Sequence, residues 1–413
     1  MSSSSVYSLR SEPVFKTTAI VDSNTMETTR EKTREMLLME SVCANCFSDD
    51  DLKQWIRECG GRRGCDFCCG YTAPTAPLSD LCEHIEALLA QHYGKAADHL
   101  PYISAEGGYQ GETWSTYELV FEECCVDLPK DFNDSLRSAI SLTLTDDIWC
   151  ARNWMSLDED DAMRFAWDRF CNHIKHERRF FFQNLDAEDL SYDAYSPMDL
   201  LTAIARLVEV EDLIQTAVPG LLLYRARPGF KGRSPTAKDF GPPPRNVCQT
   251  NRMNPAGVPM FYAALDRRTA VYEVKELVSR VGCFELIRPL RLLDLSILPA
   301  IPGIFSEEPY RRRLLLSFLH YFTNEIMQPV ARDDRVHTEY VPSQVVTEFF
   351  RDYPFESGRL DGIMYGSVAA PKQGKRNVVL FLDNLEPERS TYSPRVEIPL
   401  RFLRAQTVRL RPV

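Results

Sequence analysis

Two Cys-x2-Cys pairs near the N-terminus constrain the fold of this chain more strongly than any other feature of its sequence. Cys43 and Cys46 form the first pair and Cys65 and Cys68 the second, with 18 residues between the pairs. Two pairs at this distance are what four thiolates need to surround one tetrahedral Zn²⁺ ion. We therefore predict a small zinc-binding unit over residues 39–75, in which the metal is structural.

The residues between and beside the pairs add detail to this prediction. The stretch SDDDLKQWIREC predicts a short helix, and two further thiols, Cys59 and Cys69, are alternative candidate ligands. The alternative is four unrelated thiols in an intracellular protein. The acidic run from Asp49 to Asp51 argues against a zinc unit that binds nucleic acid.

The overall composition is that of a globular protein and limits the classes of partner. The 413 residues are 44% hydrophobic and carry a formal net charge of -11, which argues against a nucleic-acid partner. No run of 18 apolar residues occurs, so no membrane span is predicted. The 13 cysteines are an odd number, and the N-terminal MSSSSVYSLRSEPVF lacks the apolar segment of a signal peptide. We therefore expect reduced thiols and a cytoplasmic location.

The chain divides by residue pattern into a tail, the cysteine unit, a helical region and a mixed region. Residues 1–38 are rich in Ser, Thr and Glu and predict a flexible tail. Residues 76–215 predict a helical domain, because apolar side chains recur there at helical spacing. Its strongest segments are LCEHIEALLAQHYGK, MRFAWDRFCNHIKHERRFFF and SPMDLLTAIARLVEV.

At Pro219-Gly220 the pattern changes to short apolar runs bounded by turn residues, which predict strands. The predicted strands are 221–226, 261–264, 283–287, 291–296, 361–365 and 377–383. Helices are predicted near 267–280, 310–326 and 343–353. Residues 216–413 therefore predict a mixed sheet with helices, and the whole chain is expected to be of the α+β class.

One carboxylate in the mixed region stands where an apolar residue is expected. The helix predicted after the strand run FYAA has Asp266 as its N-cap. Its apolar residues share one stripe: Ala270, Val271, Val274, Leu277 and Val278. Glu273 follows Ala270 by three residues and precedes Leu277 by four, so its side chain projects from the same side of the helix.

An inward carboxylate is costly unless another group pairs with it. Arg225, in the strand run LLLYRA, and Arg252, before the Asn-Pro turn, are the candidate partners. Two interpretations stay open at this point. Glu273 and an arginine form a buried ion pair, or the carboxylate faces a pocket in which the arginines bind an anionic ligand.

The order of motifs in the mixed region resembles the RES domain, a family named for its Arg, Glu and Ser. The motifs extend over residues 219–395 and are YRAR, RMNPAG-VPMFYAA, an Ala-x2-Glu helix, Pro-Ser-Gln, DGIMYGSV and NVVLF. Small family members have a Gly-Arg-Trp-like sequence where this chain has Asn251-Arg252-Met253. The cysteine pairs with the helical region after them are similar to the HEPN-like N-terminal extension of one RES subgroup.

The resemblance implies an NAD⁺-consuming toxin with a fold akin to that of ADP-ribosyltransferases. Matched residue by residue, Arg225 and Arg252 correspond to the family's arginines and Tyr262 to its strand tyrosine. Glu273 corresponds to the glutamate and Ser367 to the serine. Guanidinium groups suit the pyrophosphate of NAD⁺, and a carboxylate suits the oxocarbenium-like ribose left when nicotinamide departs.

The leading expectation is an NAD⁺ glycohydrolase or phosphorylase that cleaves the nicotinamide-ribose bond and depletes NAD⁺. Its rival among enzymes is an ADP-ribosyltransferase that modifies a protein target. A rival of another class is an RNA-binding or HEPN ribonuclease module with the RES domain as scaffold. Arg169 and His176, with six residues between them, fit the Arg-x4-6-His pattern of such ribonucleases. The simpler interpretation of that pair is a solvated, charged helix face.

The resemblance also implies partners and leaves some residues without a role. Besides NAD⁺ as substrate, it implies an antitoxin or regulatory protein and a homodimer. His320 and His337 match no family position, so we interpret both as structural.

Overall fold

A computed structural model describes residues 39–61, 64–131, 134–182, 195–228, 235–274, 278–330, 335–367, 375–381 and 399–409, and the predicted tail 1–38 lies outside them. The chain forms two compact units, residues 1–152 with 303–307 and residues 153–302 with 308–413. The division at residue 152 falls inside the range 76–215 that we expected to form one helical domain.

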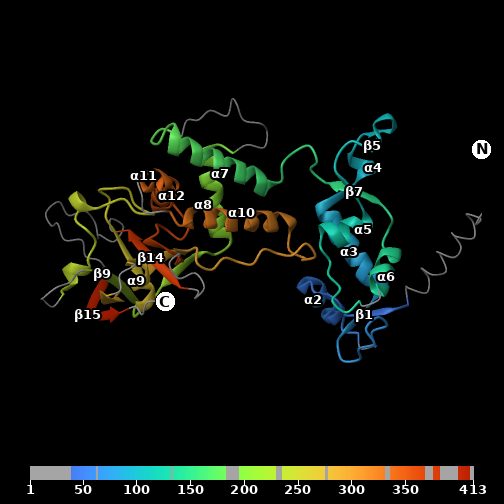
Figure 1. Ribbon diagram of the computed structural model, residues 1–413, viewed down its shortest axis with the longest axis horizontal. Coiled ribbons are helices and arrows are strands. Elements are labelled where there is room, and N and C mark those ends of the chain that lie inside the picture. The colour runs from blue at the N-terminus through green and yellow to red at the C-terminus, as the bar shows by residue number, and fades with distance from the viewer. Residues whose placement is uncertain are drawn as a thin grey trace, which may run out of the picture. The chain divides into compact units, whose positions relative to one another are not determined.

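The first unit has a helical core with small sheets at its edges (Figure 1). Its main helices are α2 (Asp50–Cys59), α3 (Leu78–His92), α4 (Ala96–His99), α5 (Thr116–Glu118) and α6 (Ser135–Thr143), and η1 (Ala44–Cys46), η2 (Ser104–Glu106) and the π-helical turn η3 (Leu119–Glu123) are shorter. The helix predicted from SDDDLKQWIREC is α2, and Asp49 caps it by accepting a hydrogen bond from Leu52 N at 2.9 Å. Apolar side chains of α2, α3 and α6 share one core.

This unit contains more strand than the sequence predicted. Two-stranded sheets pair β1 (Ser41–Cys43) with β2 (Thr75–Pro77) and β4 (Tyr102–Ile103) with β5 (Gly108–Tyr109). A third sheet has the order β3 (Tyr93–Lys95), β7 (Ile148–Ala151), β6 (Thr113–Ser115). The helix expected to run through LCEHIEALLAQHYGK therefore ends at His92, because the backbone of the next three residues pairs with β7.

The second unit is built on a mixed, eight-stranded sheet with the strand order β15-β11-β9-β10-β14-β13-β12-β8. The strands are β8 (Ile214–Ala217), β9 (Leu222–Pro228), β10 (Met260–Ala264), β11 (Val278–Leu286), β12 (Leu290–Asp294), β13 (Gly362–Gly366), β14 (Arg376–Phe381) and β15 (Leu400–Arg409). Among the strands that the structure describes in this sheet, only β12 and β13 pair in parallel. Strands β9 and β10 share a single register pair, Tyr224 with Ala264, so the sheet opens between them.

Helices of the second unit form a group that packs on the strands β12, β13 and β14. They are α7 (Glu159–His176), α8 (Pro197–Val210), α10 (Tyr310–Met327) and α12 (Val341–Asp352), and the short α11 (Val336–Glu339) precedes α12 without contributing to this core. Trp167 of α7 is 1% exposed and meets Phe322 of α10 edge to face, with ring centroids 4.9 Å apart. Two 3-10 turns, η5 (Ala237–Phe240) and η6 (Arg245–Val247), lie in the loop after β9.

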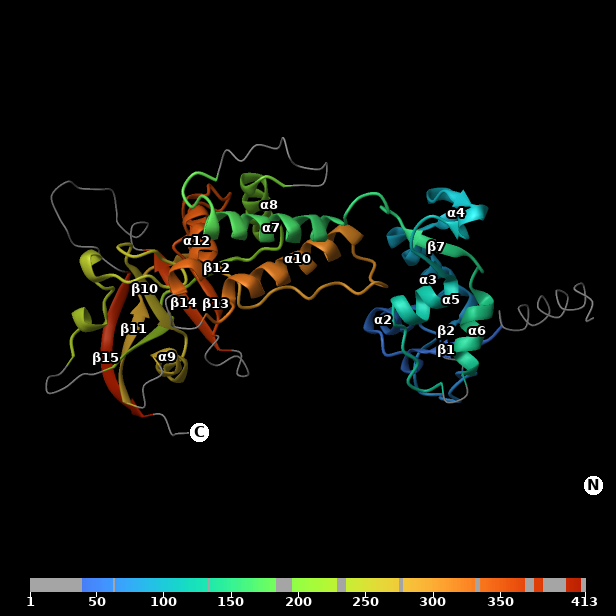
Figure 2. The same ribbon diagram turned by 45° about the horizontal axis from the view of Figure 1, so that its top comes forward.

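Helix α9 (Arg267–Val274) stands apart from that group (Figure 2). It packs on Ala226, Ala264 and Val281 of three strands. The prediction of a helix to residue 280 was wrong: Val278 begins β11 and is 51% exposed, and Leu277 lies outside the described residues. The reason is tertiary, because residues 278–286 pair with β15 and residues 279–285 also pair with β9, so their backbone groups form hydrogen bonds within the sheet. No described helix combines the length and apolar character that a membrane crossing requires.

Candidate functional site

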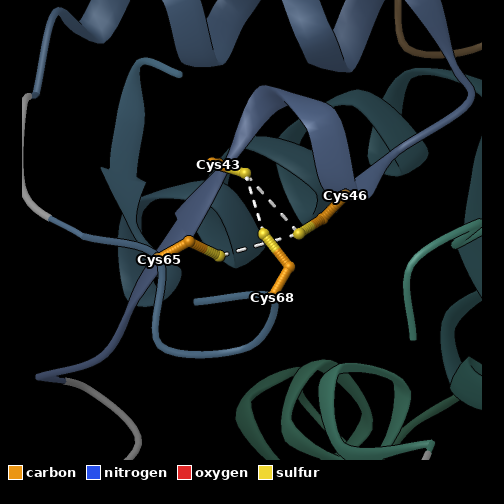
Figure 3. A group of neighbouring side chains, drawn as sticks. All are labelled: Cys43, Cys46, Cys65 and Cys68. Atoms are coloured by element: carbon orange, nitrogen blue, oxygen red, sulfur yellow. Dashed lines mark hydrogen bonds between the residues drawn. The ribbon is translucent and has the colours of Figure 1, made fainter. Parts of the chain in front are cut away.

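The four cysteines of the Cys-x2-Cys pairs lie together in the first unit (Figure 3). Their sulfur atoms lie within 4.8 Å of one another. Three of the separations are 3.7 Å for Cys43 and Cys46, 3.5 Å for Cys43 and Cys68, and 3.6 Å for Cys46 and Cys65. A tetrahedron of sulfur around Zn²⁺, with bonds of about 2.3 Å, has edges of about 3.8 Å. The geometry therefore fits a metal ion held by four thiolates.

Local structure explains how the pairs converge and why the competing thiols stay outside. Cys43 ends β1 and Cys46 lies on the following 3-10 turn, while Gly60 ends α2 with a left-handed φ of 69° and lets the chain turn back. Burial raises the pKa of the Cys43 thiol to about 11, and a bound cation would favour its thiolate form. Cys59 and Cys69, the alternative candidate ligands, are exposed and are not members of the cluster.

The second unit contains a cleft of about 700 Å³ beside the opening between β9 and β10. Four of the five residues singled out in the mixed region line it: Arg225, Arg252, Tyr262 and Glu273. The fifth, Ser367, is 3% exposed and contacts Glu273. Strands, a helix and a loop far apart in sequence thus bring all five residues to one place.

Glu273 lies in the last turn of α9, and its carboxylate is held by two side chains of the sheet. Ser367 Oγ donates to Glu273 Oε1 at 2.7 Å, and Asn377 Nδ2 donates to the same oxygen at 2.6 Å. At the other end of the helix, Asp266 Oδ1 accepts from the backbone N–H groups of Arg268 and Thr269 at 3.0 and 3.1 Å. The predicted N-cap is thereby confirmed, and the carboxylate faces a polar cleft instead of an apolar core.

Arg225 places a guanidinium in the wall of the cleft, where few contacts offset the burial of its charge. The residue is 8% exposed, and its Nη1 atom has no hydrogen-bond partner among the described residues. Its guanidinium carbon lies 5.0 Å from the centroid of the Phe261 ring. Burial first, and then the nearby charge of Arg227, lower the pKa of Arg225 to about 9. A buried cation in this position is complementary to an anion bound in the cleft.

Arg252 is held where α10 ends. Its Nη1 donates to the carbonyl oxygens of Ile326 at 2.9 Å and Gln328 at 2.7 Å, groups that a helix C-terminus leaves without intrahelical partners. Its guanidinium carbon lies 5.5 Å from the Tyr340 ring centroid. Arg252 and Tyr340 also line a second cavity of about 350 Å³, so the arginine separates two spaces.

Tyr262 is fixed through its hydroxyl group by the turn that precedes β10. The hydroxyl donates to Asn254 Oδ1 at 2.7 Å and accepts from Met253 N at 3.2 Å. Burial raises the pKa of Tyr262 well above its usual value, which keeps the phenol neutral. Tyr262 therefore offers its ring to the cleft, while its oxygen is engaged in the protein.

The structure adds residues to the site that the sequence analysis did not assign. Asn377, Tyr340 and Tyr365 line the cleft, and α12 supports the turn that carries Arg252. Gln344 Nε2 donates to the carbonyl oxygens of Asn251 at 2.8 Å and Asn254 at 3.1 Å. Ser343 and Gln344 belong to the Pro-Ser-Gln motif, whose conspicuous polarity at the start of a helix was the available signal.

The arginine and histidine of the ribonuclease-like pattern do not share a buried site. Arg169 and His176 lie on α7 and are exposed, and Arg169 Nη2 donates to the backbone oxygen of Tyr195 at 3.0 Å. The buried histidine of this helix is His173, whose Nδ1 lies 2.9 Å from Glu177 Oε2. This arrangement is that of a charged helix face.

A mixed sheet carries a polar cleft with a braced carboxylate and a buried guanidinium, which is an arrangement suited to an anionic small molecule. Comparison with known protein families identifies two regions of the chain. Residues 222–401 match the RES domain, and residues 58–188 match HEPN/RES N-terminal domain 1. The chain therefore contains a RES domain preceded by an HEPN/RES N-terminal domain. Searches of curated proteins and of solved structures gave no match.

Proposed function

We propose that the RES domain cleaves the nicotinamide-ribose bond of NAD⁺, as a hydrolase or phosphorylase of the RES toxin type. The RES family is linked to NAD⁺ degradation, and the match over 222–401 supports that link for this chain. The observation that carries the proposal is the convergence of Glu273 and its two donors with Arg225 in one cleft. We also propose that the fold is related to ADP-ribosyltransferases and that the cysteine cluster binds a structural Zn²⁺ ion.

The proposed reaction needs few groups from the protein. The bond between ribose C1′ and the pyridinium nitrogen breaks, and its electron pair goes to the nitrogen, so nicotinamide leaves as a neutral molecule. Positive charge develops on C1′ and the ring oxygen, where the carboxylate of Glu273 stabilises it. A new bond then forms between C1′ and an oxygen of water, which releases a proton and gives ADP-ribose, or an oxygen of phosphate, which gives the 1-phosphate.

The other residues of the cleft are assigned to binding. Arg225 supplies a buried positive charge to the pyrophosphate, and Arg252 lines the same cleft, with its Nη1 already engaged. Tyr262 presents its ring to the ribose or nicotinamide, and Ser367 orients Glu273. The cleft volume of about 700 Å³ lies in the range of small-molecule and cofactor sites.

Incubation of the purified chain with NAD⁺ labelled in its adenylate half tests this proposal. We expect free nicotinamide and labelled ADP-ribose or ADP-ribose 1-phosphate, with Glu273→Gln slower by a factor of about 10²–10³. Glu285→Gln is the matched control, because Glu285 pairs with Arg401 on the sheet and does not line the cleft. Label retained on protein would instead indicate ADP-ribosyl transfer, and intact NAD⁺ with an active-site carboxylate in place would refute both reactions.

A further inference from the structure

Asn377 lies at the start of β14, where its register partners are Ala264 of β10 and Tyr365 of β13. The residue is 4% exposed and lines the cleft. Its Nδ2 donates to Glu273 Oε1 at 2.6 Å. Because a carboxylate oxygen accepts hydrogen bonds and an amide oxygen cannot donate one, this contact fixes which way the amide points. The nitrogen faces Glu273, and the oxygen Oδ1 is turned away from it.

The amide oxygen of Asn377 lacks a hydrogen-bond partner within the described part of the chain. Buried side-chain oxygens are nearly always satisfied in folded proteins, so an unsatisfied oxygen on a residue that lines a cleft is a candidate contact for a bound ligand. Nη1 of Arg225, in the wall of the same cleft, is also buried without a partner among those residues. One unsatisfied acceptor and one unsatisfied donor together are complementary to a ligand that has groups of both kinds.

We infer that Asn377 is a substrate-binding residue whose Oδ1 accepts a hydrogen bond from the nicotinamide riboside end of a dinucleotide. The inference rests on the proposed function and extends it. Oδ1 and Nδ2 belong to one planar amide, so the ligand's donor lies close to Glu273 and to the bond that breaks. Two groups of NAD⁺ donate hydrogen bonds there, the carboxamide N–H of nicotinamide and a hydroxyl of the adjacent ribose. The pyrophosphate, which only accepts, then extends toward the arginines.

The roles of the two ends of the Asn377 amide can be separated by changing the substrate together with the protein. The probes are NAD⁺, its 3-acetylpyridine analogue, which lacks the carboxamide N–H, and an analogue lacking the 2′-hydroxyl of the nicotinamide riboside. Values of kcat/KM are measured for each with the wild type, Asn377→Ala and Ser367→Ala. Ser367→Ala is the matched control, because it removes the other donor to Glu273 Oε1 and leaves the Asn377 acceptor in place.

Asn377→Ala is expected to lower kcat/KM for NAD⁺ by about tenfold or more. With the wild type, the analogue that lacks the relevant donor is expected to give a kcat/KM about tenfold below that of NAD⁺. With Asn377→Ala, the same analogue and NAD⁺ should give equal kcat/KM, because the acceptor is already absent. The analogue that shows this pattern identifies the donor. Ser367→Ala should keep the wild-type ratio among the three substrates. If Asn377→Ala does not fold, Asn377→Val, which also lacks an acceptor and suits a strand, enters the same comparison.

The inference would be overturned if Asn377→Ala and each analogue lowered kcat/KM by independent factors that multiply when both changes are combined. Asn377 would then only orient Glu273. That result would leave the proposed function standing, since the wild type would still cleave NAD⁺. A wild type that leaves all three dinucleotides intact would overturn the proposed function and, with it, this assignment.

Discussion

The carboxylate of Glu273 could belong to a buried ion pair or to a ligand site, and the proposed function assigns it to a ligand site. Its Oε1 receives uncharged donors from Ser367 and Asn377, while Arg225 in the same cleft keeps a buried Nη1 atom without a partner among the described residues. A chain selected only for stability would be expected to pair such a guanidinium or to replace it. An unpaired, buried guanidinium is what the proposed binding role of Arg225 predicts.

Arg225→Met is expected to separate activity from stability at this position. Without the guanidinium, NAD⁺ cleavage should fall by about tenfold or more, because the pyrophosphate loses a charged donor. The ligand-free protein should become more stable by about 1–2 kcal/mol, because a desolvated charge is replaced by an apolar side chain of similar length. Thermal unfolding without ligand and kcat/KM measure the two effects.

Arg401→Met is the control for this substitution, since Arg401 is exposed and pairs with Glu285. Its change in unfolding free energy should stay within about 0.5 kcal/mol and its activity should be unchanged. A ligand-free Arg225→Met protein that is less stable than the wild type would contradict the view that this arginine is retained for a ligand.

At the level of elements, the cleft depends on the start of α12 as much as on the strands. The side chain of Gln344 donates to two backbone carbonyl oxygens of the turn 251–254, and Ser343 Oγ donates to the carbonyl oxygen of Arg252 at 2.6 Å. The same turn holds the hydroxyl group of Tyr262 through Asn254. One helix terminus thus positions both an arginine and a tyrosine of the site.

Gln344→Glu is expected to disturb that turn while nearly preserving side-chain shape. The new carboxylate cannot donate a hydrogen bond, so its oxygen would repel the backbone oxygens to which the amide had donated. The expected loss of folding free energy is about 1–3 kcal/mol. We expect a lower melting temperature and a kcat/KM for NAD⁺ reduced by about tenfold. Gln215→Glu, on exposed strand β8 with one carbonyl acceptor, is the control and should match the wild type. Wild-type kinetics in Gln344→Glu would show that α12 does not position the residues of the site.

Helix α7 shows that a family match and a compact unit need not share a boundary. It lies within the HEPN/RES N-terminal match over 58–188, yet it packs against α10 and α12 of the second unit. Polar contacts accompany this packing: Lys175 pairs with Glu339 at 2.7 Å, and Tyr321 donates to Asp168 at 2.7 Å. The C-terminal part of the HEPN-matched region therefore forms part of the core of the unit that contains the RES domain.

For the whole molecule, the two separate cores predict that loss of the metal does not abolish NAD⁺ cleavage. The four clustered cysteines belong to the core of the first unit, and the cleft belongs to the second. We expect one Zn²⁺ per chain by elemental analysis, and Cys46→Ser should destabilise the first unit by several kcal/mol, because metal binding contributes to folding. In calorimetry one transition should move to lower temperature, while the transition of the second unit and NAD⁺ cleavage by surviving protein persist.

Cys59→Ser is the matched control, because this thiol is exposed and outside the cluster. It should retain the zinc content and both transitions. Loss of zinc from Cys59→Ser, or full zinc content in Cys46→Ser, would show that the ligand set is not the one that the sulfur geometry indicates.

The local sequence pattern was sufficient where a feature depends on residues that lie close together in the chain. The Cys-x2-Cys spacing indicated the cluster, Asp266 indicated the start of α9, and apolar runs indicated six strands of the large sheet. It failed where partners are distant in sequence. The polar edge strand β15 gave little signal, and residues 278–280 became strand because β9 and β15 flank them.

The sequence by itself determined that Glu273 lies on the inner side of a helix and that four cysteines can reach one ion, since both follow from backbone periodicity and chain length. Only the tertiary structure decided what that carboxylate meets. Ser367 and Asn377 lie 94 and 104 residues further along the chain, and their hydrogen bonds to Glu273 exist only because β13, β14 and α9 come together. Contacts between groups so far apart depend on the packing of the whole domain, which no local pattern encodes.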